Sequence, residues 1–461
     1  MTTTPAAPAE PAALATQEPR PLRWWREFGS PPRIMGLDVA RALAVLGMVG
    51  AHIGATPTFE ITQIDTWGGL VHGRSSILFA VLAGVSIALM TGRTRIPAPE
   101  RMPTLRLNLV GRGAAIFLIG IVLEMLGTPI AVILTVYGLL YVAAIPFLRW
   151  RPSRLLVAAG LLAVLGPPLL AGLQAVTLGS TGPGVELVVF GSYPITVWMA
   201  FVLAGMAIGR MPLDRVRTAA WLLLAGVVVS AVGYFGLGVL GASAATTDTL
   251  TGGSSAGSSS WQDEGMQSGE FGVPADDLDF TDMLCDRYDD GYISCYPVSD
   301  DEGAAMEIKA NEAGPGEPAP GWAGYPHRVA QLYPAMLMSG QIFAVDPHTG
   351  GVAEVLGSGG FAVAVIALCL LISRPLRWVL VPVAALGSMP LTAYTGHIIA
   401  IVILAGPQSI LSDPAAWGWF SLVLIVAATL WAMFFGRGPL ERLVGRAAEA
   451  MASVPKEGPR P

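Results

Sequence analysis

Ten stretches of about 20 residues, each poor in charged side chains, are the feature that most constrains how this chain folds. A bilayer core about 30 Å thick is crossed by a helix of roughly 20 mostly apolar residues. The whole chain is 53% hydrophobic, only 13% charged, and has a mean hydropathy of +0.59, which excludes an ordinary soluble protein of 461 residues. The sequence therefore predicts an all-α integral membrane protein, a bundle of about ten transmembrane helices. The ten stretches are residues 35–53, 69–91, 107–125, 130–148, 155–174, 185–209, 219–240, 352–373, 379–404 and 417–436.

Arginines alternate between the connections, which supports the count of ten. Basic residues precede the first stretch and follow the second, fourth, sixth, eighth and tenth, whereas the first, third, fifth and ninth connections contain none. Because Lys and Arg are retained on the cytoplasmic side, we expect a multi-pass protein of the plasma (inner) membrane with both termini in the cytoplasm. Residues 1–33 then form a disordered cytoplasmic leader rich in Ala, Pro and Thr, and residues 437–461 form a cytoplasmic tail.

The seventh connection, residues 242–351, differs sharply in composition from the helical blocks 34–241 and 352–436. It begins with a Gly/Ser-rich run and continues with many acidic residues, so we expect a long, partly disordered extracytoplasmic loop. Cys285 and Cys295 lie in this loop, and their spacing in an oxidising compartment predicts a disulfide, the alternative being two unpaired thiols. The apolar segment 329–345 contains Pro334 and is short, which favours an interfacial helix over an eleventh span.

The first stretch carries ionisable side chains that are costly in lipid and are rarely kept without a role. Asp38 and Arg41 are three residues apart and can form an ion pair. The eleven positions from Arg41 to His52 correspond to about three turns plus roughly 20°, so these two side chains share one face of the helix, about 16 Å apart along its axis. The alternative is an anchoring charge pair and a histidine that only caps the helix.

This first stretch resembles two groups of membrane acyltransferases. Arg41-x10-His52, preceded by Leu37-Asp38, resembles the signature of the acyltransferase-3 family, and residues 33–48 are more similar to the heparan-alpha-glucosaminide N-acetyltransferase-like proteins and the related DUF1624 and DUF418 groups. Residues 73–84 and the Leu-Thr-x-Tyr segment within 386–397 look like the second and late helices of these families. The Gly-Pro-Leu-Glu of residues 438–441 resembles the closing motif of the DUF418 group, whereas the external loop has no recognised counterpart.

The resemblance implies an acyltransferase that moves an acyl group, usually acetyl from acetyl-CoA, across the membrane to an extracytoplasmic sugar hydroxyl or amine. By position, His52 is then the general base or transient acyl carrier, and Arg41 is a donor-side group held by Asp38. Arg106 and Arg112 are candidates for the coenzyme phosphates, or else arginines that only set the topology.

The sequence departs from the heparan group at the position of His52, where the mammalian enzymes have asparagine and use a histidine in the following loop. Counting from His52 places Gln63 near that second position, and His72, beside Arg74, is this chain's own second candidate for the base. Both His52 and His72 stay open. His397 is interpreted either as a helix-packing residue or as a residue that lines the site.

The expected partners are membrane lipid, acyl-CoA and an extracytoplasmic glycan or glycolipid acceptor, with a homodimer left open. We expect no nucleic acid and no metal, because no metal-ligand spacing is present. A transporter or exporter of a cell-envelope precursor is the competing function, since helices broken at 166–168 and 387–390 would suit it. A membrane scaffold whose external loop binds an envelope partner is the third.

Overall fold

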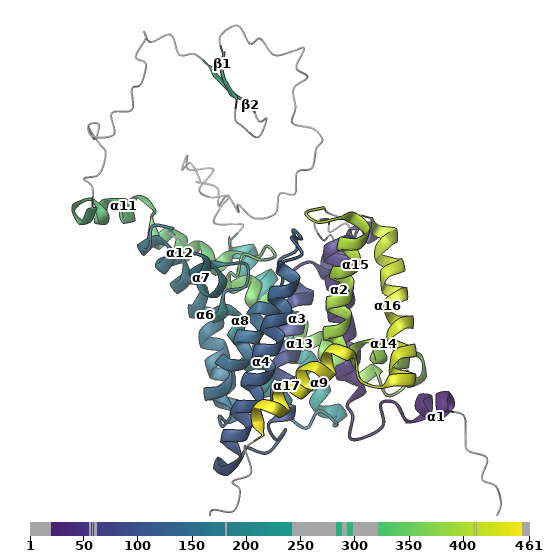
Figure 1. The fold of residues 1–461 in the computed structure, drawn as a ribbon. Helices are drawn as coiled ribbons and strands as arrows, with labels where there is room; N and C mark the ends of the chain where they lie inside the picture. Colours follow the sequence, from purple (N-terminus) through teal and green to yellow (C-terminus); the bar gives the residue numbers. More distant parts are fainter. Residues whose placement is uncertain are drawn as a thin grey trace, which may run out of the picture. The chain divides into compact units, whose positions relative to one another are not determined.

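The computed structural model describes residues 20–54, 57, 59, 62–179, 182–241, 283–287, 293–297, 321–409, 411 and 413–453. Its contacts divide the chain into a helical unit, residues 1–253 with 332–461, and a smaller unit, residues 254–331. Figure 1 shows the helices and strands, and short 3-10 and π segments are called η in the text. The helical unit contains α1 Arg20–Glu27, α2 Met35–Ile53, η1 Ile64–Val71, α3 Arg74–Met90, η2 Pro99–Arg101, α4 Met102–Glu124, α5 Leu134–Ala143, η3 Ile145–Phe147, α6 Pro152–Val176, α7 Pro183–Val185, η4 Glu186–Phe190, α8 Ile195–Gly209, α9 Val216–Ala231, η5 Val232–Leu237, α12 Pro334–Phe343, α13 Val352–Ile372, α14 Arg377–Gly387, α15 Pro390–Ala405, α16 Pro414–Phe435 and α17 Pro439–Ala452.

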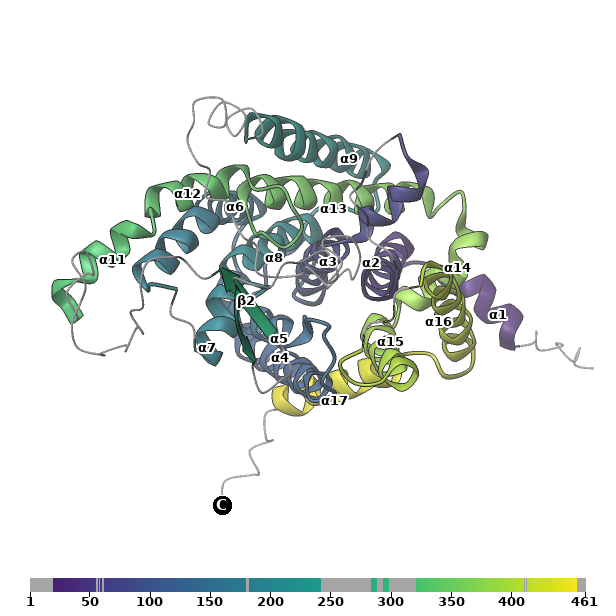
Figure 2. The ribbon, with the colours of Figure 1, turned by 90° about the horizontal axis from the view of Figure 1, so that it is seen from above.

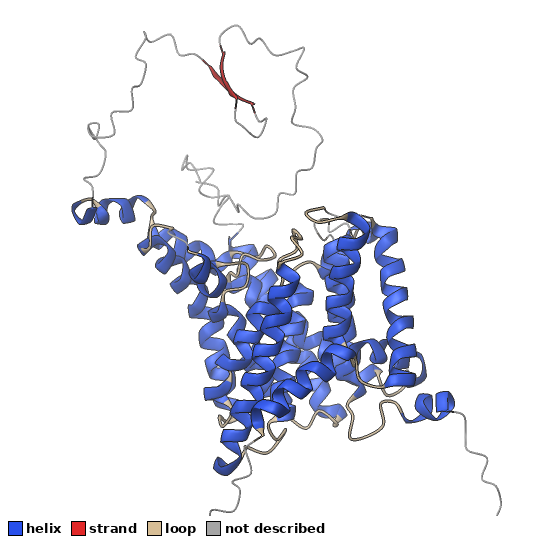
Figure 3. Cartoon of the chain, viewed as in Figure 1, coloured by secondary structure: helices blue, strands red, loops and turns tan. Residues whose placement is uncertain are grey.

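Each of the ten apolar stretches forms helix, which confirms the predicted all-α membrane bundle (Figure 3). Seven helices in the described part of the chain are long and apolar enough to cross a membrane, and α14 with α15 makes an eighth span if the bent pair is counted as one. The other two stretches form the shorter apolar helices α5 and α8. Residues 334–343, within the segment expected to be interfacial, form α12, which packs against α6.

Several helix limits differ from the expected stretches, and prolines account for most of the differences. The fourth stretch forms only the ten residues of α5 before η3, which contains Pro146, and α8 begins after Pro194 rather than at residue 185. α14 and α15 meet at an angle of 69°, because Pro390 disfavours helix in the residue before it. The expected break at residues 166–168 is wrong: α6 continues through Pro167 and Pro168, as transmembrane helices tolerate proline.

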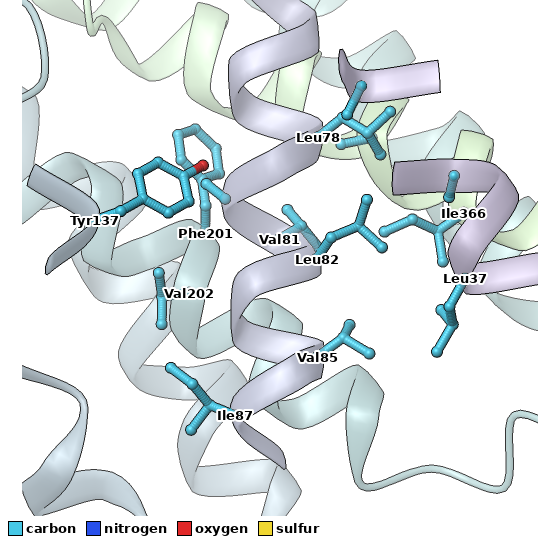
Figure 4. Packing of buried hydrophobic residues seen from close by; sticks show 14 of the residues in the cluster. Leu37, Leu78, Val81, Leu82, Val85, Ile87, Tyr137, Phe201, Val202 and Ile366 are labelled. Carbon is cyan, nitrogen blue, oxygen red and sulfur yellow. The ribbon is translucent and has the colours of Figure 1, made fainter. Parts of the chain in front are cut away.

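α3 is the central helix of the bundle, with α2, α8 and α13 packed around it (Figure 2). Leu78, Val81 and Leu82 on α3 are buried against neighbouring helices (Figure 4). α3 and α8 approach closely because each has a glycine at the crossing. An added Cβ on Gly84 would lie 2.1 Å from the carbonyl oxygen of Val202, and one on Gly205 would lie 2.0 Å from that of Val81.

The two ends of α2 can be distinguished by their side chains, and we name them accordingly. The arginine end carries Arg33, Asp38 and Arg41, and the histidine end carries His52. Figure 1 shows α1 and α17 toward the arginine end and α12 toward the histidine end of the helical unit. The placement of both chain ends in the cytoplasm stays a prediction.

The smaller unit contains β1 Met283–Arg287, β2 Ile293–Pro297, η7 Gly321–Ala323 and α11 Tyr325–Gln331. The two strands are antiparallel, and their register pairs Cys285 directly with Cys295. The side chains of both strands lie outside the described residues, so the disulfide stays a prediction. The disorder expected of the leader falls mainly on residues 1–19, and that of the loop on residues 242–282 and 298–320, all outside the described ranges.

Candidate active site

Asp38 organises the arginine end. Its carboxylate is 6% exposed and accepts hydrogen bonds from two arginines, Arg33 Nε at 2.6 Å and Arg41 Nη1 at 2.8 Å. The other terminal nitrogen of Arg41 donates to Ser86 Oγ on α3 at 2.9 Å. The expected i,i+3 pair is therefore present, and Arg41 points toward α3 inside the protein rather than toward lipid.

Arg112 lies near the same region, and Arg106 does not share its side of the helix. Arg112 on α4 and Arg41 on α2 both interact electrostatically with Tyr141 on α5, and Arg112 Nε donates to Asn108 Oδ1 at 3.1 Å. Arg106 is exposed, and the six positions that separate it from Arg112 turn it about 120° around α4. The structure thus brings one of the two candidates for the coenzyme phosphates toward Arg41.

The face of α2 between its two ends is covered by protein. Val45 and Met48, which lie on this face between Arg41 and His52, are 0% and 3% exposed. On other sides α2 is held by close contacts. An added Cβ on Gly387 of α14 would lie 1.7 Å from the carbonyl oxygen of Asp38, and Trp417 Nε1 of α16 donates to the carbonyl of Leu46 at 3.0 Å. The expected shared face therefore points into the bundle.

At the histidine end, His52 contacts a histidine from another helix. His52 Nδ1 lies 2.9 Å from Nε2 of His397 on α15, and the rings stack with centroids 5.2 Å apart and an interplanar angle of 16°. His397 is completely buried, whereas His52 is half-buried. One imidazole of the pair is thus enclosed by protein and the other is partly accessible.

Two further histidines lie near this pair. The rings of His72 and His348 have centroids 5.2 Å apart, and both residues interact electrostatically with His52. The loop that carries His348 is fixed by Glu354 near the start of α13, whose carboxylate accepts the backbone N–H groups of His348 at 2.9 Å and Gly350 at 2.7 Å. Four of the five histidines of the chain therefore gather at one end of the bundle.

A small pocket, with about 20 Å³ accessible to water, adjoins His348 of this group. His348, Glu354 and Trp198 are among the residues that line it, so it offers an imidazole, a carboxylate and an aromatic ring beside the histidines. Nearby, Arg74 Nε donates a hydrogen bond to the Tyr234 hydroxyl at 2.9 Å. That hydroxyl lies 2.6 Å from Ser358 Oγ. Within the described ranges, no group of three or more His, Cys, Asp or Glu side chains could hold a metal ion.

Sequence reasoning singled out Asp38, Arg41, His52, His72 and Arg112, and the structure places these residues at the two ends described above. It did not find the partners Ser86, Tyr141 and His348, because their residue types are unremarkable where they stand. The pairing of His397 with His52 was also missed, although a histidine inside an apolar stretch is itself a signal. Glu124, at the end of α4, is exposed and accepts a hydrogen bond from Thr135 Oγ1 at 3.0 Å.

Comparison with known proteins gives one match. Residues 33–237 match the family model described as heparan-alpha-glucosaminide N-acetyltransferase, catalytic. The match begins at Arg33 and includes α2 through α9, with Asp38, Arg41, His52 and His72, but it ends before α15 and His397. No curated protein matches the chain. No solved structure matches it either.

Proposed function

Because residues 33–237 match the model of the heparan-alpha-glucosaminide N-acetyltransferase catalytic family, we propose that the chain is a membrane acyltransferase. It takes an acetyl group from acetyl-CoA at the arginine end and delivers it to a sugar hydroxyl or amine at the histidine end. One observation carries the proposal. A single inward face of α2 bears a held guanidinium, Arg41, near one end and a hydrogen-bonded imidazole, His52, at the other.

The arginine end has the charge that a coenzyme with several phosphates requires. Arg33, Arg41 and Arg112 supply three guanidinium groups, and Asp38 supplies the one carboxylate that pairs with the first two. Positive charge therefore remains for phosphate oxygens, which arginine binds in a bidentate manner. We assign Arg112 to the phosphates ahead of Arg106, because Arg112 interacts electrostatically with Tyr141, as Arg41 does. In this proposal the arginine end faces the cytoplasm.

In this proposal the slender arm of an acyl-CoA passes along the inward face of α2. The axial distance from Arg41 to His52 is about 16 Å, at about 1.5 Å per residue. Val45 and Met48 on this face are apolar and buried against other helices, so the helices around α2 have to separate for the thioester to pass, and these side chains offer it no competing nucleophile. The acetyl carbonyl is thereby presented to an acceptor at the histidine end.

At the histidine end, His52 acts as the general base. Its Nε2 takes the proton of the acceptor N–H or O–H while the acceptor nitrogen or oxygen attacks the thioester carbonyl carbon. The carbon–sulfur bond then breaks, and the coenzyme thiolate takes the proton from the His52 imidazolium and leaves as the thiol. The partial exposure of His52 allows an acceptor to reach it, and the small pocket beside His348 marks the side of the histidine end from which the acceptor approaches.

The test is incubation of the purified protein with radiolabelled acetyl-CoA and envelope extract. We expect wild type to transfer label, and His52→Ala to lower the transfer by about 100-fold or more, the range of a general base. His327→Ala is the matched control, because His327 lies in the smaller unit and its side chain bonds to Gln331 of the same helix. Loss with His72→Ala but not with His52→Ala would assign the base to His72. No transfer under any condition would favour the transporter.

A further inference from the structure

His397 is the feature of the histidine end that the family match does not explain. It lies on α15, beyond residues 33–237, and 345 positions separate it from His52 in sequence. It is 0% exposed, and its ring and that of Tyr394 form a T-shaped pair with centroids 5.1 Å apart. An imidazole buried so completely costs free energy unless its nitrogens are hydrogen-bonded.

The hydrogen bond between the two imidazoles restricts their protonation. A contact of 2.9 Å between two ring nitrogens requires one N–H and one unprotonated nitrogen, so Nδ1 of His52 and Nε2 of His397 cannot both carry hydrogen. Which of the two carries it depends on the second nitrogen of His397. The backbone carbonyls of Ala393 and Tyr394, one turn earlier in α15, interact with the His397 ring, and Nδ1 is the buried ring nitrogen for which the described residues supply no other partner.

Carbonyl oxygens only accept hydrogen bonds, so they favour the hydrogen of His397 on Nδ1. The Nε2 of His397 is then an acceptor, and Nδ1 of His52 must donate to it. This leaves Nε2 of His52 without a hydrogen, which is the state that a general base requires. The Nε2 of His397, which accepts the hydrogen bond from Nδ1 of His52, also stabilises the imidazolium that forms when His52 takes a proton.

We propose that His397 is a positioning residue that fixes His52 as the tautomer with hydrogen on Nδ1 and directs the free Nε2 lone pair to the acceptor. This inference rests on the proposed function for its catalytic meaning, but the tautomer itself does not depend on activity. Three side chains interact electrostatically with His52: His397 from α15, His348 from the loop before α13 and His72 at the end of η1. The carboxylate of Glu124 interacts electrostatically with Tyr394, which contacts His397.

Three substitutions on α15 separate positioning from packing. His397→Phe keeps the ring and removes the acceptor, and we expect it to lower kcat about 100-fold with the KM for acetyl-CoA unchanged. His397→Gln places an amide oxygen near the former Nε2, and we expect it to stay within about 10-fold of wild type. Thr395→Val is the control, because it removes a buried hydroxyl from the same helix for which the described residues offer no hydrogen-bond partner.

The direct readout is ¹⁵N NMR of protein labelled only at its five histidines. Histidine→Gln variants assign the signals, and the shifts of the two ring nitrogens report which one carries hydrogen. We expect hydrogen on Nδ1 of His52 in wild type and His397→Gln, and the loss of this preference in His397→Phe. Hydrogen on Nε2 of His52 in wild type would overturn the inference.

The activity assay distinguishes the two failures. If His52→Ala abolishes transfer while His397→Phe retains the wild-type kcat, the positioning role is wrong and the acyltransferase stands. If no variant and no wild-type sample transfers acetyl, the proposed function fails, and the NMR result alone decides the tautomer.

Discussion

Glu441 of α17 caps the N-terminus of α15 at Thr392. Its carboxylate accepts the backbone N–H groups of Leu391 at 2.8 Å and Thr392 at 3.1 Å, and the hydroxyl of Thr392 at 2.5 Å. A carboxylate at a helix N-terminus satisfies free N–H groups and interacts favourably with the helix dipole. The closing Gly-Pro-Leu-Glu segment therefore fixes the start of the helix that carries His397.

We expect Glu441→Ala to destabilise the protein by about 1 kcal/mol, as the loss of a helix cap does. The start of α15 would loosen, and acetyl transfer would fall because His397 sits two turns further along. Glu441→Gln, whose amide oxygen still accepts hydrogen bonds, should lose less of both. Thermal unfolding in detergent and the transfer assay measure the two effects. Equal losses of stability and transfer in Glu441→Ala and Glu441→Gln would show that the hydrogen bonds of the cap do not cause the losses.

The close approach of Gly387 to Asp38 predicts a second effect on stability. Gly387→Ala would force α14 away from the Asp38 carbonyl, and we expect a loss of about 1–3 kcal/mol, as for an overpacked core. Gly160→Ala is the control, since no atom lies within 4 Å of a Cβ there and alanine favours helix. Thermal unfolding of both variants compares them, and an unchanged midpoint for Gly387→Ala would contradict the close packing.

Removing the charge of Asp38 tests the organisation of the arginine end. Asp38→Asn leaves Arg41, whose side chain is 19% exposed, without its carboxylate, and we expect a loss of about 2 kcal/mol, moderated by the partial exposure of both arginines. The KM for acetyl-CoA should also change, because Arg41 loses its fixed position. Glu27→Gln breaks the exposed pair with Arg23 and should change stability by less than about 0.5 kcal/mol. Similar losses in both variants would refute the special role of Asp38.

The register of β1 and β2 makes the predicted disulfide geometrically accessible. Directly paired residues of an antiparallel ladder have Cα atoms about 4.5–5.5 Å apart, within the range that disulfides span. We expect a membrane-impermeant maleimide to label Cys285 and Cys295 of intact cells only after reduction. Cys369, buried in α13, should stay unlabelled in the folded protein. Labelling of the pair without reduction would exclude the disulfide, and labelling only in lysed cells would place the loop in the cytoplasm.

Much of the fold could be predicted because lipid imposes a length on every crossing helix. The ten stretches followed from absent charge over about 20 residues, and α2 and α13 were placed within a residue of their ends. The short α5 and the late start of α8 could not be predicted, because hydropathy does not show where an apolar segment leaves the helical conformation. The helix α17 was also not predicted, since the amphipathic tail is too polar for a span.

Part of the candidate site could also be predicted from the sequence, and part could not. The Asp38–Arg41 pair and the shared face with His52 follow from helix geometry alone, so the sequence was enough. Ser86 and His397 join them through tertiary packing, and a single sequence holds no information on which distant helices meet. The family match likewise ends before α15, so the contact with His397 required coordinates.

The most direct test of the account is the sidedness of the reaction in sealed proteoliposomes. Acetyl-CoA labelled in its acetyl group is enclosed inside, and envelope extract as the source of acceptor is supplied outside. The account predicts that labelled acceptor accumulates outside while free coenzyme thiol accumulates inside, and that both products vanish with His52→Ala. Labelled acetyl-CoA crossing the membrane intact, or coenzyme thiol appearing on the acceptor side, would contradict it.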